Sequence, residues 1–212
     1  MNCCVSVAED IYWVGANDRE TPLFEALWPL PRGVAYNSYL IQDEKVALID
    51  TVKGAYFSDF LEKLQAHLGP EGTIDYLVIN HMEPDHSGSV RALREVYPEM
   101  TVVGNAKTKN LLENFYGPAK NFLEIKEGEI LSLGKHELSF VMIPMVHWPE
   151  SMVCYDNTSK TLFSTDAFGA FGSLDGGIFD DEVDMSYYED EILRYYSNIV
   201  GRYSAQVQKA IQ

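Results

Sequence analysis

Basic side chains are scarce in this chain, which carries 16 Lys and Arg against 32 Asp and Glu and a formal charge of −16. Nucleic acids and anionic membranes attract proteins through clustered positive charge. The composition therefore excludes a partner of either kind that is bound by bulk electrostatics. A small neutral substrate or a basic protein partner fits this charge balance better.

Cysteine is also scarce, with only Cys3, Cys4 and Cys154 among 212 residues. Three cysteines cannot build a disulfide framework, and the adjacent pair lacks the spacing by which two thiolates share a zinc ion. Reduced thiols in a cytoplasmic protein are the simplest interpretation. No basic segment precedes an early apolar run, and no run of about 18 apolar residues occurs, so we expect neither a signal peptide nor a transmembrane helix.

The hydrophobic pattern predicts an α/β protein with two strand-rich halves. No linker, low-complexity segment or internal repeat divides residues 1–212, so we expect one domain, built from two sheets packed face to face with helices outside each. Residues 17–32 lack periodicity and suggest an ordered surface excursion. Strands are predicted at 11–14, 34–42, 45–50, 76–79, 101–103, 122–125, 130–133, 138–143, 152–155 and 161–164, and helices at 54–68, 89–96, 105–116 and 185–212, the last interrupted near Gly201.

One stretch concentrates side chains that bind metals. His81, Glu83, Asp85 and His86 fall within six positions, directly after a predicted buried strand. In an extended chain His81, Glu83 and Asp85 share one face, and a turn at Pro84 would let the first two bind one ion while Asp85 and His86 reach a second. A buried strand has no structural reason to end in four ionisable groups, so we interpret the stretch as a two-metal loop.

Two later residues extend this site. His147 and Asp166 lie just beyond predicted strands, and strand ends converge on one rim of a sheet. A carboxylate such as Asp166 can bridge two cations with its two oxygens. The second metal is then one protein ligand short. The expected ligands are His81, Glu83, His147 and bridging Asp166 for one metal, and Asp85, His86 and the same Asp166 for the other.

The ligand types bear on the metal and its surroundings. A mixed set of imidazoles and carboxylates with open positions favours iron over zinc, although donor chemistry alone leaves the two nearly even. Asp50 either orients a ligand histidine or caps the following turn. Trp148 and the Trp28 region can line an apolar pocket over the metals, with core packing as the simpler role for each. The residues interpreted as ordinary solvated surface are His67, His136 and the acidic run Asp180-Asp181-Glu182.

These residues resemble a known family. The His-x-Glu-x-Asp-His pattern from His81 to His86, with His147-Trp148-Pro149 and Asp166 downstream, is similar to the metallo-β-lactamase-like domain of flavodiiron proteins, also called A-type flavoproteins. Residues 36–41 and 48–51 belong to the same resemblance, which runs from about Ile11 to the C-terminus. Ordinary hydrolases of this superfamily carry His-x-His-x-Asp-His instead, so Glu83 marks the diiron branch.

The resemblance implies a four-layer αββα sandwich of two mixed sheets. It also implies a non-haem centre of two Fe ions, held by the six expected ligands, that reduces O₂ to water or NO to N₂O. Electrons would arrive from FMN on a flavodoxin-like domain, which is reduced by a donor such as rubredoxin or a flavin reductase. A head-to-tail homodimer would bring the flavin of one subunit to the irons of the other.

This chain departs from the family pattern in two ways. The family's second iron takes a last histidine from a segment after the final helix, and this chain stops at Gln212 before such a segment. A flavodoxin-like domain is also absent from the sequence. We therefore expect a fold that is incomplete at the C-terminus and FMN on a domain or chain not present here, and the sequence does not identify the residues that bind FMN.

Two other classes of function stay open at this point. A dinuclear zinc hydrolase would use a bridging hydroxide to attack an ester, thioester or phosphodiester. Glu83 argues against that class weakly on donor chemistry and strongly on family pattern. A flavin-free diiron oxygen sensor would bind O₂ and signal to a partner, and the missing flavodoxin part keeps this class open.

Overall fold

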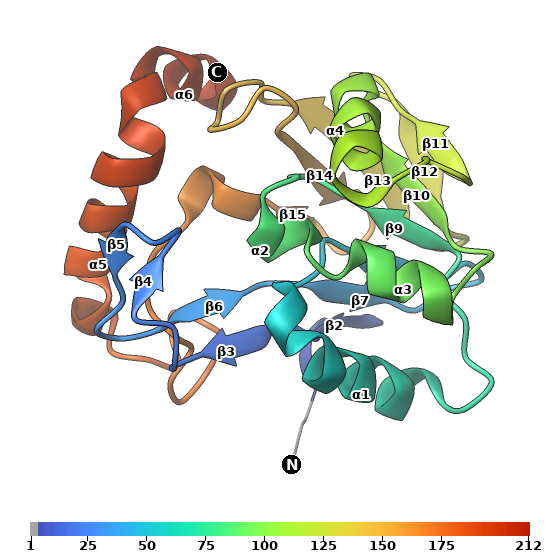
Figure 1. Ribbon diagram of the computed structural model, residues 1–212, viewed down its shortest axis with the longest axis horizontal. Helices are drawn as coiled ribbons and strands as arrows, with labels where there is room; N and C mark the ends of the chain where they lie inside the picture. Colours follow the sequence, from blue (N-terminus) through green and yellow to red (C-terminus); the bar gives the residue numbers. More distant parts are fainter. Residues whose placement is uncertain (1–3) are drawn as a thin grey trace.

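Two β-sheets packed face to face form the centre of the computed structural model, which describes residues 4–212 (Figure 1). The strands of the first sheet, in spatial order, are β1 (Val5–Ala8), β2 (Ile11–Trp13), β7 (Tyr39–Ile41), β8 (Ala47–Ile49), β9 (Tyr76–Val78), β10 (Thr101–Gly104) and β11 (Phe122–Glu124). Those of the second are β12 (Ile130–Ser132), β13 (Glu137–Met142), β14 (Met152–Asp156) and β15 (Thr161–Phe163).

The two sheets differ in strand direction. Strands β8 to β11 run parallel and β1, β2, β7 and β8 pair antiparallel, so the first sheet is mixed, as the resemblance implied. All three pairs of the second sheet are antiparallel, which its short connections allow, so this sheet is not mixed in the described residues. The overall α/β fold class is confirmed.

One hydrophobic core lies between the sheets. It takes alternate residues from each strand, because successive side chains point to opposite faces. The first sheet contributes Ile41, Ile49 and Val78, and Phe140 and Cys154 come from the second, all at most 1% exposed. This core fixes the distance between the two sheets whose ends carry the candidate site.

A second core lies under the helices on the other face of the first sheet. Those helices are α1 (Phe57–Leu68), α3 (Val90–Val96) and α4 (Ala106–Tyr116). Phe60, Leu93 and Leu112 from these helices pack in one cluster with Leu48 and Leu77 from the sheet. Because β8 and β9 are covered on both faces, their sequences are continuous runs of hydrophobic residues.

The outer face of the second sheet is only partly covered in residues 4–212, with Val153 buried on it at 9% exposure. Ile130, Val141 and Leu162 point outward from it and are 59%, 42% and 47% exposed. The C-terminal helices lie instead at one end of the sandwich (Figure 1, red). They are α5 (Glu189–Tyr195), a π-helical turn (Tyr196–Val200), a 3₁₀ turn (Gly201–Tyr203) and α6 (Ser204–Ile211), which matches the predicted interruption near Gly201.

Two predicted segments near the N-terminus have a different structure. The strand expected over 34–42 is divided into β6 (Val34–Tyr36) and β7, because β6 leaves the first sheet and pairs with β3 (Ala16–Asp18). The excursion over 17–32 contains a small hairpin, β4 (Leu23–Phe24) and β5 (Trp28–Pro29). Alternation of apolar residues continues through a change of sheet, so the sequence pattern could not reveal it.

The described cysteines fit the interpretation of reduced thiols. Cys154 is completely buried between the sheets, where burial raises the pKa of its thiol. Cys4 is half-buried beside α1, and Cys3 lies outside the described residues. Within residues 4–212, no helix combines the length and apolar character needed to span a bilayer.

Asp18 joins the β3–β6 pair to the loop that follows β3. Its side chain is fully buried and accepts hydrogen bonds from the backbone N–H of Glu20 (3.0 Å) and Thr21 (2.8 Å) and from the hydroxyl of Tyr36 (2.7 Å). Burial alone would raise the pKa of Asp18, but its hydrogen bonds to Thr21 and Tyr36 hold it well below the usual range. The carboxylate form therefore stabilises this part of the fold.

We predict that Asp18→Asn lowers the free energy of unfolding by about 1–3 kcal/mol at pH 7. The pKa of Asp18 is lower in the folded protein than in the unfolded chain, where it is about 3.9, so the carboxylate stabilises the fold at pH values above about 3.9. This contribution is lost as the pH falls below that value towards the pKa of the folded protein. Urea denaturation at several pH values should therefore show the gap between wild type and variant narrowing below about pH 4. The exposed Asp181→Asn is the matched control, and a gap that stays constant with pH would contradict the assignment.

Candidate functional site

The residues His81 to His86 lie at the carboxyl end of β9, as predicted. They do not form one extended strand, because the short helix α2 (Pro84–Ser87) begins at Pro84. Proline suits the first helical position, where its missing N–H costs nothing. Asp85 and His86 therefore project from a helical turn, and the shared extended face expected through Asp85 ends at Glu83.

Four side chains from both sheets converge on one point. One ligand atom from each of His81, Glu83, His147 and Asp166 lies within 4.8 Å of all the others. Glu83 Oε2 is 3.3 Å from His81 Nε2 and 2.9 Å from His147 Nε2, and Asp166 Oδ2 is 3.3 Å from each of the same nitrogens. The first predicted ligand group is thus assembled in space.

Asp166 also faces the second predicted group. Its other oxygen, Oδ1, is 3.0 Å from His86 Nε2, and that nitrogen is 3.7 Å from Asp85 Oδ2. The carboxylate belongs to a 3₁₀ turn (Thr165–Phe168) directly after β15. The two oxygens of one carboxylate therefore point to two different groups, which is the arrangement of a bridging ligand.

The backbone around the site is strained. Asp50, Met145 and Thr165 have positive φ angles of 52°, 68° and 48°, in the left-handed region that non-glycine residues rarely adopt. Thr165 is β-branched, so its conformation is especially unfavourable. Asp50 itself faces His86, Met145 lies two positions before His147, and Thr165 directly precedes Asp166. Strained backbone of this kind is typical of functional sites.

Three neighbours support the histidines. Asp50 Oδ1 accepts the Asn80 N–H at 2.8 Å, and its Oδ2 lies 3.5 Å from His86 Nδ1, so it faces a candidate ligand. The Trp148 ring stands edge-on to His81, with centroids 5.3 Å apart. Glu150 Oε1 lies 2.9 Å from His81 Nδ1. Sequence reasoning missed Glu150, because the path of the loop after β13 is not encoded in a periodic pattern.

Burial and mutual charge shift the pKa values in the metal-free site. Burial would lower the pKa of His81, but hydrogen bonds to Glu150 and Glu83 raise it to about 10. His147 is raised to about 9, again against burial, through Asp166 and Glu83. Burial raises the pKa of Asp85 to about 7. Without a metal, the imidazoles hold protons between the carboxylates, and a bound cation must displace those protons.

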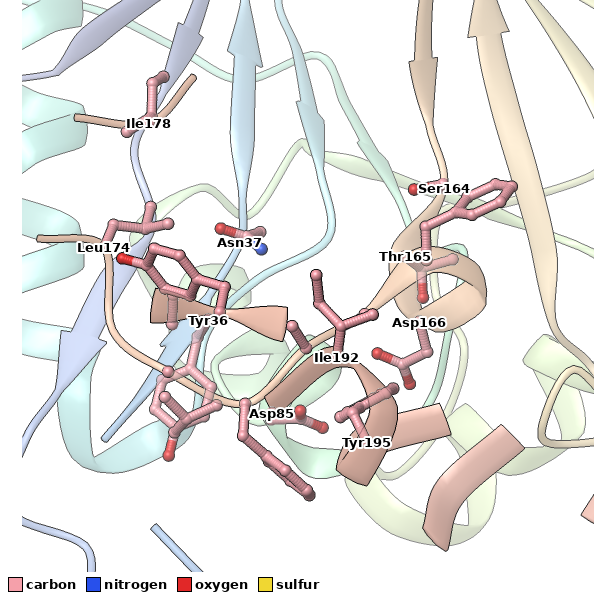
Figure 2. A pocket seen from close by; sticks show the side chains of 18 of the residues that line it. Tyr36, Asn37, Asp85, Ser164, Thr165, Asp166, Leu174, Ile178, Ile192 and Tyr195 are labelled. Atoms are coloured by element: carbon pink, nitrogen blue, oxygen red, sulfur yellow. The ribbon is translucent and has the colours of Figure 1, made fainter. Parts of the chain in front are cut away.

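A cavity of about 400 Å³ opens beside the second group. Asp85 and Asp166 (Figure 2) line it together with His86, whereas His81, Glu83 and His147 do not. Trp28 and Trp148 are not among its lining residues and pack instead against the hydrophobic core, which is the simpler of the two roles expected for them. The aromatic lining residues are Phe24, Tyr36, Tyr39, Phe163, Phe168, Phe171, Phe179, Tyr188 and Tyr195.

Tyr195 is a second residue that sequence reasoning missed. It projects from α5 toward Asp166 (Figure 2) and is 5% exposed. Burial, the nearby charges of Asp166 and Asp85 and a hydrogen bond to Asp166 raise its pKa well above the ordinary value. Tyr195 therefore keeps its proton at neutral pH, beside the shared carboxylate. In the sequence it was one apolar position in a helical stripe.

The remaining polar residues have structural or surface positions. His136 was expected at the surface, but it is 1% exposed, and its Nδ1 lies 2.8 Å from Asp156 Oδ2. His136 directly precedes β13, two positions before the inward-facing Leu138, so its side chain points to the same buried side. His67 is half-buried and pairs with Gln42 at 2.8 Å. The acidic run 180–182 is exposed, as predicted.

Comparison with known proteins agrees with this geometry. Residues 34–200 match the family model described as ODP family beta lactamase. The anaerobic nitric oxide reductase flavorubredoxin of Vibrio vulnificus is 39% identical over 211 residues, which cover 98% of this chain and 42% of that protein.

Two solved structures have the same fold. The flavodiiron protein of Giardia intestinalis superposes with a TM-score of 0.93 at 32% identity, and covers 99% of this chain and 51% of that one. Rubredoxin oxygen:oxidoreductase of Desulfovibrio gigas gives a TM-score of 0.93 at 35% identity, over 99% and 52% of the two chains. The chain thus spans about half the length of the proteins it matches.

The family model covers most of the chain, and both the sequence relatives and the solved structures align over nearly all of it. The predicted resemblance to flavodiiron proteins is confirmed, and the chain belongs to the ODP family of β-lactamase-like domains.

Proposed function

We propose that this chain is the diiron part of an enzyme that reduces NO to N₂O, O₂ to water, or both. The observation that carries the proposal is the position of Asp166, whose two oxygens face His81 and His147 on one side and His86 on the other. The names of the relatives, nitric oxide reductase and rubredoxin oxygen:oxidoreductase, support the same chemistry.

The donor set fits two iron ions. Imidazole nitrogens and carboxylate oxygens, without a thiolate, suit iron with open coordination positions. Carboxylates at most 8% exposed, such as Glu83, Asp85 and Asp166, are costly to bury unless cations neutralise them. His81, Glu83, His147 and Asp166 would hold one iron, and Asp85, His86 and Asp166 the other. We expect the last ligand of the second iron to come from residues outside this sequence.

The protein groups around the cavity suit a small gas. When bound, the iron pair supplies electrons and open positions for a diatomic substrate. Phe24 and Phe171, which are buried, give the cavity wall an apolar surface that limits water. Tyr195 holds a proton beside Asp166, where reduction of either gas consumes protons. Asp50 keeps His86 facing the shared carboxylate.

Electrons and partners come from outside this chain in our proposal. FMN on a flavodoxin-like domain or chain would deliver the electrons, and rubredoxin or a flavin reductase would reduce the flavin. Phe168 and Leu193, near the cavity, are 71% and 66% exposed, which suits a partner surface such as that of a head-to-tail homodimer. The reduced cysteines support a cytoplasmic location.

A dinuclear zinc hydrolase is not favoured. The fold alone would allow it, since hydrolases share this superfamily. The matched relatives, however, are named as reductases of nitric oxide and oxygen. Glu83 also stands where the hydrolase pattern has histidine.

The first test concerns metal content. Glu83→Ala should lose about half of the bound iron, because Glu83 belongs to one group only, whereas Asp166→Ala should lose more, because its carboxylate serves both groups. Iron per chain is measured by elemental analysis after anaerobic purification, and circular dichroism checks the fold. Glu129→Ala, an exposed carboxylate, is the control. Full iron content in Glu83→Ala would contradict the ligand assignment.

The second test concerns turnover. The chemically reduced iron protein, mixed with O₂ or NO in a stopped-flow instrument while electrons are supplied in excess, should consume the gas repeatedly, and Glu83→Ala should not. One stoichiometric spectral change without continued gas consumption would indicate a sensor. A zinc-only protein with esterase or thioesterase activity would refute the reductase proposal.

A further inference from the structure

We propose that Glu150 is the positioning residue for His81, and that its carboxylate makes the His81 side of the centre the more electron-rich half. The inference rests on the proposed metal centre and adds a residue and an asymmetry to it.

The two ring nitrogens of His81 have different surroundings. Nε2 lies 3.3 Å from both Glu83 Oε2 and Asp166 Oδ2, so it points to the place where a cation would bind. Nδ1 lies 2.9 Å from Glu150 Oε1. A carboxylate accepts hydrogen bonds, so the ring proton belongs on Nδ1 and the lone pair of Nε2 is directed to the metal.

Glu150 is itself held rigidly. Its side chain is fully buried, and the same Oε1 accepts the Met82 N–H at 2.9 Å. Its carbonyl accepts from Asn105 Nδ2 at 2.7 Å, and the Asn105 side chain also accepts the N–H groups of Lys107 (3.0 Å) and Thr108 (3.1 Å) at the start of α4. The carboxylate is thus fixed to the loop that carries His81, and the Glu150 backbone is fixed to the start of α4.

The other half of the centre lacks an equally close contact. His86 Nδ1 lies 3.5 Å from Asp50 Oδ2, which is a longer contact than the 2.9 Å between His81 Nδ1 and Glu150 Oε1. A carboxylate hydrogen-bonded to a metal-binding imidazole increases the electron donation of that imidazole to the metal. The short contact of His81 and the longer one of His86 therefore make the two halves electronically unequal.

A purely structural role is the competing explanation, and the chain contains an example of it. His136 and Asp156 form a buried pair with an Nδ1 to Oδ2 distance of 2.8 Å, but His136 Nε2 has no hydrogen-bond partner among residues 4–212. His81 differs because its Nε2 faces two carboxylates. The Asp156→Asn variant is therefore a matched control for removing a buried carboxylate from a histidine.

The test uses zinc as a diamagnetic probe, so its outcome does not depend on iron chemistry or gas reduction. Zinc affinity is measured by competition with a chelator, and ¹⁵N-histidine NMR of the zinc-loaded protein follows the His81 ring, assigned with His81→Asn. We expect Glu150→Ala to weaken zinc binding about 10- to 100-fold and to lose the downfield Nδ1–H signal of His81. Glu150→Gln, which keeps an acceptor but not the charge, should lie between wild type and Glu150→Ala.

The control separates positioning from stability. Asp156→Asn should lower the melting temperature while leaving zinc affinity and the His81 signal unchanged. If Glu150→Gln lowers only the melting temperature and leaves zinc affinity and the His81 signal as in wild type, Glu150 is a structural anchor and the proposal is wrong. Failure of the wild-type protein to bind zinc at His81 would overturn it as well. If the zinc affinities and the His81 signals are as expected but the iron-loaded wild-type protein does not reduce either gas, only the proposed function is refuted.

Discussion

The site depends on one carboxylate that faces two groups of ligands. Asp166 projects from the end of β15 in the second sheet, whereas His81 and His86 follow β9 in the first. Neither sheet could build the cluster alone, because the two sets of side chains meet only when the inter-sheet core sets their separation. The packing of residues such as Ile49 and Phe140 therefore positions the site as directly as the loops do.

The same arrangement is costly for the metal-free protein. Several carboxylates and three histidines are nearly buried at one end of the sandwich, and left-handed residues such as Asp50 and Thr165 add backbone strain. Protons on the imidazoles offset part of this charge, as the raised pKa values of His81 and His147 indicate. Cations would offset it more completely, so we expect metal binding and folding stability to be linked.

The sequence was sufficient for the part of the site that has a local signature. The spacing from His81 to His86 and the positions of His147 and Asp166 after strands predicted the cluster, because ligands at strand ends meet on one rim. Glu150 and Tyr195 had no such signature, since their roles depend on the path of a loop and the docking of α5. The division of the strand at 34–42 was missed for a related reason. Alternation of apolar and polar residues shows that one face of a strand is buried, but it does not show which sheet the strand joins.

The two halves of the centre also differ in access, which bears on how a gas would enter. Asp85, His86 and Asp166 line the cavity, whereas His81 is 1% exposed and is enclosed by Glu150 and the Trp148 ring. A substrate can therefore approach from the His86 side, because only this group of ligands lines the cavity. The closed side carries the firmly positioned histidine. On the proposed function, one half of the centre is built to receive the gas and the other to donate electron density to it.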